Sequence, residues 1–196
     1  MNIPEHLILR THHVRLEPLN FTHENGLRQA VCDGELWRLV FTSAPEPQQV
    51  TDYIQTALDT RFPFAVIDER SEQVIGTSSF YAINPEIKRL EIGYTWYAQS
   101  HQRTHVNTAC KYLLLTYAFE TLQCNCVGWR TDILNTRSQA AIERLGAHKD
   151  GVLRSFERRK DDSLRDTVMY SMLASEWTEA KIRLQQRLNQ HTFQAA

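Results

Sequence analysis

The hydrophobic pattern of the chain is densest between Gln102 and Glu120, where it predicts a buried helix behind a polar turn. Apolar residues recur there every three or four positions, at Val106, Cys110, Leu113, Tyr117 and Ala118. Further apolar residues fill the flanks, so little of the helix surface is left for water. The turn before such a helix presents unpaired backbone N–H groups and the positive end of the helix dipole. This arrangement predicts an anion-binding site at residues 102–107.

The remaining pattern alternates between strands and helices. Period-two or continuous apolar runs predict strands at residues 14–19, 62–68, 73–81, 90–97, 127–132, 152–156 and 167–173. Helical periodicity and capping signals predict helices at residues 22–31, 45–60 and 135–145, with a last helix that starts after Ser175. The chain shows no internal repeat and no linker. We therefore expect a single domain over residues 1–196, with mixed α/β elements around one sheet.

The composition is that of an ordinary globular protein. The chain has 196 residues, of which 42% are hydrophobic and 23% are charged, and its formal net charge is −1. This balance argues against electrostatic binding to nucleic acid or to a membrane surface. No segment approaches the roughly 18 apolar residues of a membrane span, and the first residues lack the apolar stretch of a signal peptide. We therefore expect a cytoplasmic protein.

Four cysteines in a chain of this length do not form a disulfide framework. Cys124 and Cys126 would share one face of a strand, and no second cysteine or histidine pair at metal-ligand spacing accompanies them. We expect these two residues to be small buried apolar side chains, and we expect no metal site.

Three sequence blocks occur in an order that is typical of one enzyme family. They are the strand segment Leu90-Glu91-Ile92-Gly93-Tyr94, the turn from Gln102 to Thr108, and Thr131-Asp132 followed by Asn135-x-x-Ser138 and Glu143-Arg144-Leu145-Gly146-Ala147. A weaker match is Arg165-Asp166 before the last predicted strand. Over about residues 10–190 the chain resembles the GCN5-related N-acetyltransferase (GNAT) family, and within it the RimJ/RimL-like branch.

The resemblance implies a fold and an activity. The fold is α/β with an α+β mixed sheet: a single central, mostly antiparallel sheet with a splayed parallel pair, flanked by helices. The implied activity is that of an acetyl-CoA-dependent N-acetyltransferase, which moves an acetyl group to a primary amine by direct transfer in a ternary complex. The acceptor would be a protein N-terminus or a small-molecule amine. The absence of a cysteine in an activated pair also favours direct transfer.

The expected coenzyme A site combines the strand, the polar turn and the helix after residue 134. Its residues are Tyr94, Thr95, Trp96, Gln102, Arg103, Thr104, His105, Val106, Asn107, Thr108, Asn135, Arg137 and Ser138. At two positions of the turn, the family has glycine where this chain has His105, and glycine or alanine where it has Asn107. Glycine lets the backbone adopt positive φ angles, which asparagine and histidine also tolerate. We therefore expect the turn to form, with side chains where the family has none.

Three residues are candidates for the chemistry. Strand alternation places Glu91 on one face with Gly93, Thr95 and Tyr97, opposite Leu90, Ile92, Tyr94 and Trp96. Burial in a sheet raises the basicity of a carboxylate, so Glu91 is either the general base or a member of a structural hydrogen-bond network. By resemblance, Glu157 is a second candidate base; alternatively it is a surface residue paired with Arg158 or Arg159.

We further expect backbone N–H groups at a bulge around Tyr94 to donate hydrogen bonds to the oxyanion of the transition state.

Ser138 is the third candidate. The resemblance implies that it donates a proton to the leaving thiolate and that Asn135 binds the pantetheine arm. The same spacing also describes an N-cap asparagine followed by a serine in the first helical turn.

Two other interpretations of the sequence remain possible at this point. The first is a non-catalytic coenzyme A-binding sensor or interaction module on the same fold, and the second is an interaction protein that no longer binds the coenzyme. The apolar stripe of the last helix could also serve a homodimer; it consists of Trp177, Ala180, Leu184 and Leu188.

Overall fold

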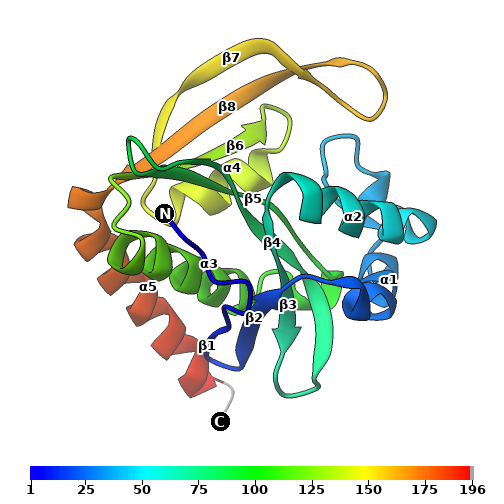
Figure 1. Ribbon diagram of the computed structural model, residues 1–196, viewed down its shortest axis with the longest axis horizontal. Helices are drawn as coiled ribbons and strands as arrows, with labels where there is room; N and C mark the ends of the chain where they lie inside the picture. The colour runs from blue at the N-terminus through cyan, green and yellow to red at the C-terminus, as the bar shows by residue number, and fades with distance from the viewer. Residues whose placement is uncertain (195–196) are drawn as a thin grey trace.

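One mixed sheet organises the protein (Figure 1). The computed structural model describes residues 1–194, with side chains through residue 190. Within that range eight strands form one sheet in the order β1-β2-β3-β4-β5-β6-β8-β7. The pair β5–β6 is parallel and every other neighbouring pair is antiparallel. The expected fold class, with its single parallel pair, is confirmed.

The elements follow the predicted order with a few differences. The strands are β1 (Leu9–Thr11), β2 (Val14–Pro18), β3 (Phe62–Asp68), β4 (Gln73–Asn84), β5 (Arg89–Tyr97), β6 (Cys126–Asp132), β7 (His148–Arg158) and β8 (Leu164–Leu173). The helices are α1 (Glu24–Cys32), α2 (Val50–Thr60), α3 (Val106–Thr116), α4 (Thr136–Glu143) and α5 (Ala174–Gln194). Short 3₁₀ turns precede α1, α2 and α3, and a π-helical turn at Tyr117–Thr121 extends α3. The sequence pattern missed the three-residue strand β1 and underestimated the length of β7.

Helices cover both faces of the sheet and create two apolar cores (Figure 1). The larger core lies between the sheet and the helices α3, α4 and α5, and it includes Phe80, Leu114 and Tyr170. The smaller core lies between the sheet and the helices α1 and α2. As predicted, α3 is the buried helix, because its apolar surface meets the sheet on one side and α5 on the other.

The last helix does not offer its apolar stripe to a partner. Trp177, Ala180, Leu184 and Leu188 are at most 5% exposed and belong to the larger core. The expectation that these residues could form a dimer interface is therefore wrong, because α5 needs them to dock against α3. Among the described residues, no helix is long and apolar enough to cross a membrane.

The predicted alternation of β5 holds for only half of the strand. Leu90 and Ile92 face the larger core, as expected, but Tyr97 joins them there while Trp96 lies in the smaller core. The cause is a β-bulge, since Ser78 of β4 is the single residue between the pairs Thr77↔Trp96 and Ser79↔Gly93. One extra residue in a strand reverses the facing of every side chain after it.

The close contact of β4 with β5 below the bulge depends on a glycine. A Cβ atom on Gly76 would lie 2.1 Å from the Trp96 carbonyl oxygen and 2.9 Å from the Tyr97 Cα. Both are backbone atoms, which cannot move without shifting the strand. The strand pair therefore tolerates no side chain at this position.

We predict that Gly76→Ala lowers the free energy of unfolding by about 3 kcal/mol, because the added methyl overlaps the neighbouring backbone. Gly151→Ala in β7 is the matched control, since nothing lies within 4 Å of its Cβ position; it should stay within about 0.5 kcal/mol of the parent protein. Urea unfolding of both variants measures the difference. Equal stabilities would contradict the close strand contact.

Candidate active site

The parallel strands β5 and β6 pair over only three positions. The pairs are Arg89↔Cys126, Leu90↔Val127 and Glu91↔Gly128, and no ladder pair follows them. Beyond Glu91, β5 continues along β4 while β6 continues along β8 (Figure 1). We call the diverging segments 92–97 and 129–132 the split. Backbone groups that face the split have no neighbouring strand to bond, so they are available to a ligand.

A bulge in β5 lies at the edge of the split. Tyr94 and Thr95 together oppose Ser78, and Tyr94 has a φ angle of 50°. Thr77 fixes the distorted backbone because its hydroxyl donates to the Tyr94 carbonyl oxygen at 3.0 Å. The bulge that we expected around Tyr94 is thus present.

Glu91 lies at the point where the split begins, and Arg130 of β6 binds it. The Nε and Nη2 atoms of Arg130 donate to the two carboxylate oxygens of Glu91 at 2.7 and 2.8 Å. Glu91 is only 4% exposed, and Gly128 leaves room for it, since a Cβ there would lie 3.1 Å from the Glu91 Cγ. The hydrogen bonds to Glu91 raise the pKa of Arg130. Glu91 therefore belongs to a fixed hydrogen-bond network, which was one of the two roles that the sequence allowed for it.

The partner of Glu157 differs from the one we expected. Arg165 of β8 donates to Glu157 Oε2 at 2.5 Å across the β7–β8 hairpin, so the pairing with Arg158 or Arg159 is wrong. The reason is a register shift in β7 between Leu153 and Glu157, which places Glu157 directly opposite Arg165. The other oxygen of Glu157 accepts no hydrogen bond from the described residues.

The polar turn before α3 is built around Arg103. Arg103 has a φ angle of 60°, whereas His105 is right-handed at −68° and Asn107 is already inside α3. The left-handed residue is therefore Arg103, and not His105 or Asn107, where the family has its glycines. Within the part of the chain that the structure describes, the amides of Arg103, Thr104, Asn107 and Thr108 donate no hydrogen bond. These four amides lie where the helix pattern predicted an anion-binding site, and their role as such a site stays a prediction.

The side chains of His105 and Asn107 contact other parts of the protein. His105 Nε2 lies 3.0 Å from the carbonyl oxygen of His12, in the β1–β2 turn. Asn107 Oδ1 accepts a hydrogen bond from the Tyr97 hydroxyl at 3.3 Å. These side chains thus anchor the turn to the sheet, and they replace the glycines without occupying the positive-φ position.

The first turn of α4 is joined to the turn before α3. Asn135 Oδ1 accepts from the Ser138 amide at 3.0 Å, so Asn135 is the N-cap of α4, as its spacing also allowed. Arg137 Nη2 donates to Gln102 Oε1 at 2.5 Å, and Gln102 Nε2 donates to the Tyr97 carbonyl oxygen at 2.8 Å. The Ser138 hydroxyl has no hydrogen-bond partner among the described residues. The structure therefore brings both helix N-termini to one end of the split.

Two of the expected coenzyme-binding side chains point into the cores. Trp96 is 3% exposed and its Nε1 donates to the Tyr53 hydroxyl at 3.2 Å, while Val106 is 2% exposed. A ligand in the split could reach these two residues only through their backbone. The hydroxyl of Thr95 also forms its hydrogen bonds within the protein. The other expected residues lie along the split or in the turn before α3.

The sequence analysis missed a buried lysine beneath the bulge. Lys111 of α3 is 5% exposed, and its Nζ donates to the hydroxyls of Ser78 at 3.0 Å and Thr95 at 2.6 Å. No carboxylate among the described residues pairs with it, and burial lowers its pKa. A signal was present, because Lys111 is the one lysine, arginine, aspartate or glutamate between Val106 and Phe119. Lys111 therefore connects α3 to the bulge of β5.

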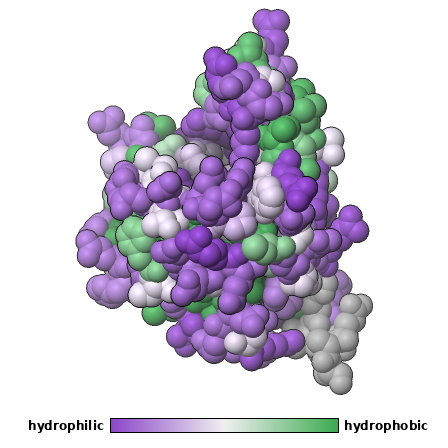
Figure 2. All heavy atoms as spheres, turned by 90° about the vertical axis from the view of Figure 1, so that its right-hand side faces the viewer, coloured by the Kyte–Doolittle hydropathy of each residue, from purple (hydrophilic) through white to green (hydrophobic). Residues whose placement is uncertain are grey.

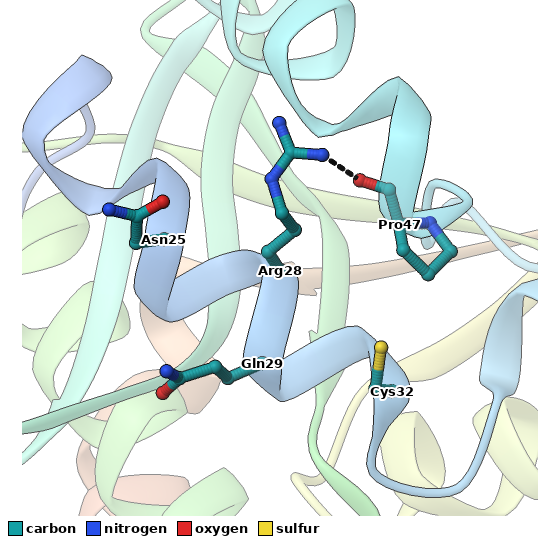
Figure 3. A pocket seen from close by; sticks show the side chains of 5 residues that line it. All are labelled: Asn25, Arg28, Gln29, Cys32 and Pro47. Atoms are coloured by element: carbon teal, nitrogen blue, oxygen red, sulfur yellow. Dashed lines mark hydrogen bonds between the residues drawn. The ribbon is translucent and has the colours of Figure 1, made fainter.

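A separate hollow lies on the outer side of α1, next to the turn before α2 (Figure 3). It is lined by Asn25, Arg28, Gln29, Cys32 and Pro47. None of the expected site residues reaches it, so it is not part of the candidate active site. Across the described residues, no three His, Cys, Asp or Glu side chains are grouped so that they could hold a metal ion.

We predict that Lys111→Met changes how stability depends on pH. The folded-state pKa of Lys111 is lowered, so the unfolded chain binds more protons between that value and the ordinary lysine value of about 10.4. The stability of the parent protein should therefore rise with pH in this window, by at most about 1.4 kcal/mol per pH unit, and Lys111→Met should lack that rise. Urea unfolding between neutral pH and about pH 10 measures it. The exposed Lys149→Met is the control, and a variant profile parallel to the parent would contradict a buried, unpaired ammonium.

Comparison with known proteins agrees with this geometry. The family model described as "Acetyltransferase (GNAT) domain" matches residues 13–148. An uncharacterized N-acetyltransferase, p20 of Bacillus licheniformis, is 28% identical over 175 residues, which cover 86% of this chain and 97% of p20. The crystal structure of a GCN5-related N-acetyltransferase from Brucella melitensis superposes with a TM-score of 0.85 at 30% identity, and covers 94% of this chain and 86% of that one.

The fold is also shared with RimL, a ribosomal L7/L12 alpha-N-protein acetyltransferase whose structure holds coenzyme A. The TM-score is 0.72 at 18% identity, over 85% of this chain and 98% of RimL. The family model covers most of the chain, and both the split and the turn before α3 lie within the matched segment. The chain therefore belongs to the GNAT family of acetyltransferases.

Proposed function

We propose that this protein transfers an acetyl group from acetyl-CoA to a primary amine, and that the transfer is direct, within a ternary complex. The observation that carries the proposal is the split between β5 and β6, which opens beside a turn with four unbonded amides. Membership of the acetyltransferase family implies acetyl-CoA as the donor. The amine acceptor and the direct route are our inference for this chain.

The residues around the turn fit a coenzyme A pyrophosphate. The free amides of Arg103, Thr104, Asn107 and Thr108 are concentrated at the positive end of α3. The Arg103 side chain is exposed and has no ion-pair partner among the described residues, so its charge is available to a phosphate. The coenzyme would supply the acetyl group as a thioester. Asn135 and Arg137, at the start of α4, lie where they could contact its pantetheine arm.

Glu157 is the better candidate for the general base. Both oxygens of Glu91 are bound by Arg130, whereas one oxygen of the partly exposed Glu157 accepts no hydrogen bond from any residue that the structure describes. An ammonium with a pKa near 10 must lose a proton before it can attack a carbonyl carbon. Glu157 would accept that proton, directly or through a water molecule. Glu91 would instead fix Arg130, and with it the two edges of the split.

Two further features suit direct transfer. The hydroxyl of Ser138 is free and lies in the first turn of α4, where it could donate a proton to the leaving sulfur. Cys110, Cys124 and Cys126 are buried, and burial raises the pKa of Cys124 to about 11 and also raises the pKa of Cys126. A protonated, buried thiol is a poor nucleophile. These cysteines therefore do not favour an acetyl-enzyme intermediate.

Two classes of amine are candidate acceptors. RimL, which shares the fold, acts on the N-terminus of a ribosomal protein, and that favours a protein N-terminus. The family as a whole is equally compatible with a small-molecule amine. A non-catalytic coenzyme A-binding module is the alternative function, and the ion pairing of both Glu91 and Glu157 is the observation in its favour.

Release of free thiol from acetyl-CoA, measured with a panel of amines and N-terminal peptides, tests the proposal. We expect release that depends on the amine, and a loss of at least about 100-fold in kcat for Glu157→Gln with coenzyme binding intact. Glu91→Gln should mainly lower the melting temperature, because it leaves Arg130 without its partner.

A large loss of kcat in Glu91→Gln, with an active Glu157→Gln, would reverse the assignment of the base. Stabilisation of the protein by acetyl-CoA without thiol release for any amine would instead support the non-catalytic module.

A further inference from the structure

Two arginines and four aromatic rings form a row across the split, on the side of the sheet where α2 lies. We call this set the arginine–aromatic row; in spatial order it consists of Tyr53, Arg61, Tyr94, Tyr81, Arg130 and Phe156. The helix α3, with its anion site, lies on the opposite face of the sheet. A second substrate that meets a coenzyme bound at α3 would therefore approach over this row.

In the first half of the row, Arg61 packs against Tyr94, which is part of the bulge. Arg61 directly follows α2, and its guanidinium carbon lies 3.9 Å from the ring centre of Tyr94 and 5.2 Å from that of Tyr53. Tyr94 is 40% exposed, so this end of the row is open to solvent. Arg61 therefore lies next to the backbone segment at which we expect the acetyl carbonyl.

The second half of the row crosses to the other edge of the split. The rings of Tyr94 and Tyr81 are 5.2 Å apart and nearly perpendicular. The guanidinium carbon of Arg130 lies 5.7 Å from the ring centres of both Tyr81 and Phe156. Phe156 is 44% exposed on β7. Figure 2, which views the molecule from the side of α1 and α2, shows that hydrophobic residues gather in its upper part, at the height of the β7–β8 hairpin.

The two arginines differ in how their charge is balanced. Arg130 forms a bidentate ion pair with Glu91. Arg61 has no carboxylate within ion-pair distance among the described residues, and its guanidinium donates one hydrogen bond there, a long one of 3.4 Å to the Thr60 hydroxyl. Among the described residues, the buried Nε atom of Arg61 also lacks a hydrogen-bond partner. A partly buried cation without a counter-charge is costly to the folded protein, and a ligand carboxylate at the Nη groups of Arg61 would offset that cost.

We propose that Arg61 binds a carboxylate of the acceptor, so that the preferred substrate is an amine that also carries an acidic group. A guanidinium stacked on an aromatic ring is held in one plane and leaves its edge free for a carboxylate. The acidic group could belong to a small amino acid-like molecule or to an acidic side chain close to a peptide N-terminus; both present the same amine and carboxylate chemistry. This inference rests on the proposed acetyl transfer to an amine.

Two matched pairs of acceptors test the inference. The first pair is γ-aminobutyrate and n-butylamine, and the second is the tripeptide amides Ser-Glu-Ala and Ser-Gln-Ala. Within at least one pair, the parent protein should show a kcat/KM at least about tenfold higher for the acidic member, with acetyl-CoA as donor. The pair that shows the preference identifies the source of the carboxylate.

Variants of Arg61 should remove that preference. Arg61→Gln should lower kcat/KM for the acidic member at least about tenfold more than for its neutral partner. Arg61→Lys, which keeps the charge but loses the planar fork, should restore part of the preference. Arg28→Gln is the matched control. Arg28 lies on α1 and donates to the Glu24 carboxylate and to the Pro47 carbonyl oxygen, beside the hollow that is separate from the candidate active site (Figure 3). It should leave the preference intact.

Three results would contradict the inference. A parent protein that shows no preference for the acidic member of either pair would overturn it, as would an Arg61→Gln variant that lowers kcat/KM equally for both members. In either case amines are still acetylated, so the proposed function survives. The absence of thiol release with every amine would overturn the proposed function and this inference with it.

Discussion

The ion pair between Glu91 and Arg130 crosses the sheet at the point where its parallel strands part, and the site depends on this contact. Three backbone pairs hold β5 to β6 before the split, and the Glu91 carboxylate is the last side chain over that paired segment. Arg130 reaches it from the diverging part of β6 and engages both oxygens. The pair therefore fixes the separation of the two edges, where backbone hydrogen bonds no longer can. Because Glu91 is buried, removal of either partner would leave a desolvated charge.

The bulge in β5 and the helix α3 act together on the same region. The bulge turns Trp96 into the smaller core and Tyr97 into the larger one, and Tyr97 then binds Asn107 at the start of α3. Lys111, one turn further along α3, binds Thr95 at the bulge. Two polar contacts thus connect the helix end that presents free amides to the strand distortion at the edge of the split. The turn with its unbonded amides and the bulge at the split are therefore connected parts of one arrangement.

Local patterns in the sequence were sufficient to predict most of the helices and strands. The apolar period of α3, the N-cap Asn135 and the strand signals at residues 62–68 and 90–97 depend on near neighbours in the chain, and the structure agrees with them. The resemblance to the acetyltransferase family added the parallel pair, which no local pattern specifies. The coenzyme-binding and catalytic roles of the individual residues stay predictions.

Long-range partners could not be predicted from the sequence. The pairing of Glu91 with Arg130, and of Glu157 with Arg165, depends on strand register that a single bulged residue changes. The same bulge reversed the expected facing of Trp96 and Tyr97. Arg61 was missed because its significance lies in the lack of an acidic partner, which is a property of three-dimensional packing alone.

The central claim is that coenzyme A binds at the turn before α3 and extends into the split. A titration of isotope-labelled protein with coenzyme A, followed by backbone amide chemical shifts, tests it most directly. We expect the largest shift changes at Arg103, Thr104, Asn107 and Thr108, with further changes at Tyr94 and Thr95, and none around the hollow on α1. Saturable changes elsewhere with an unaffected turn, or no change at millimolar coenzyme, would contradict it.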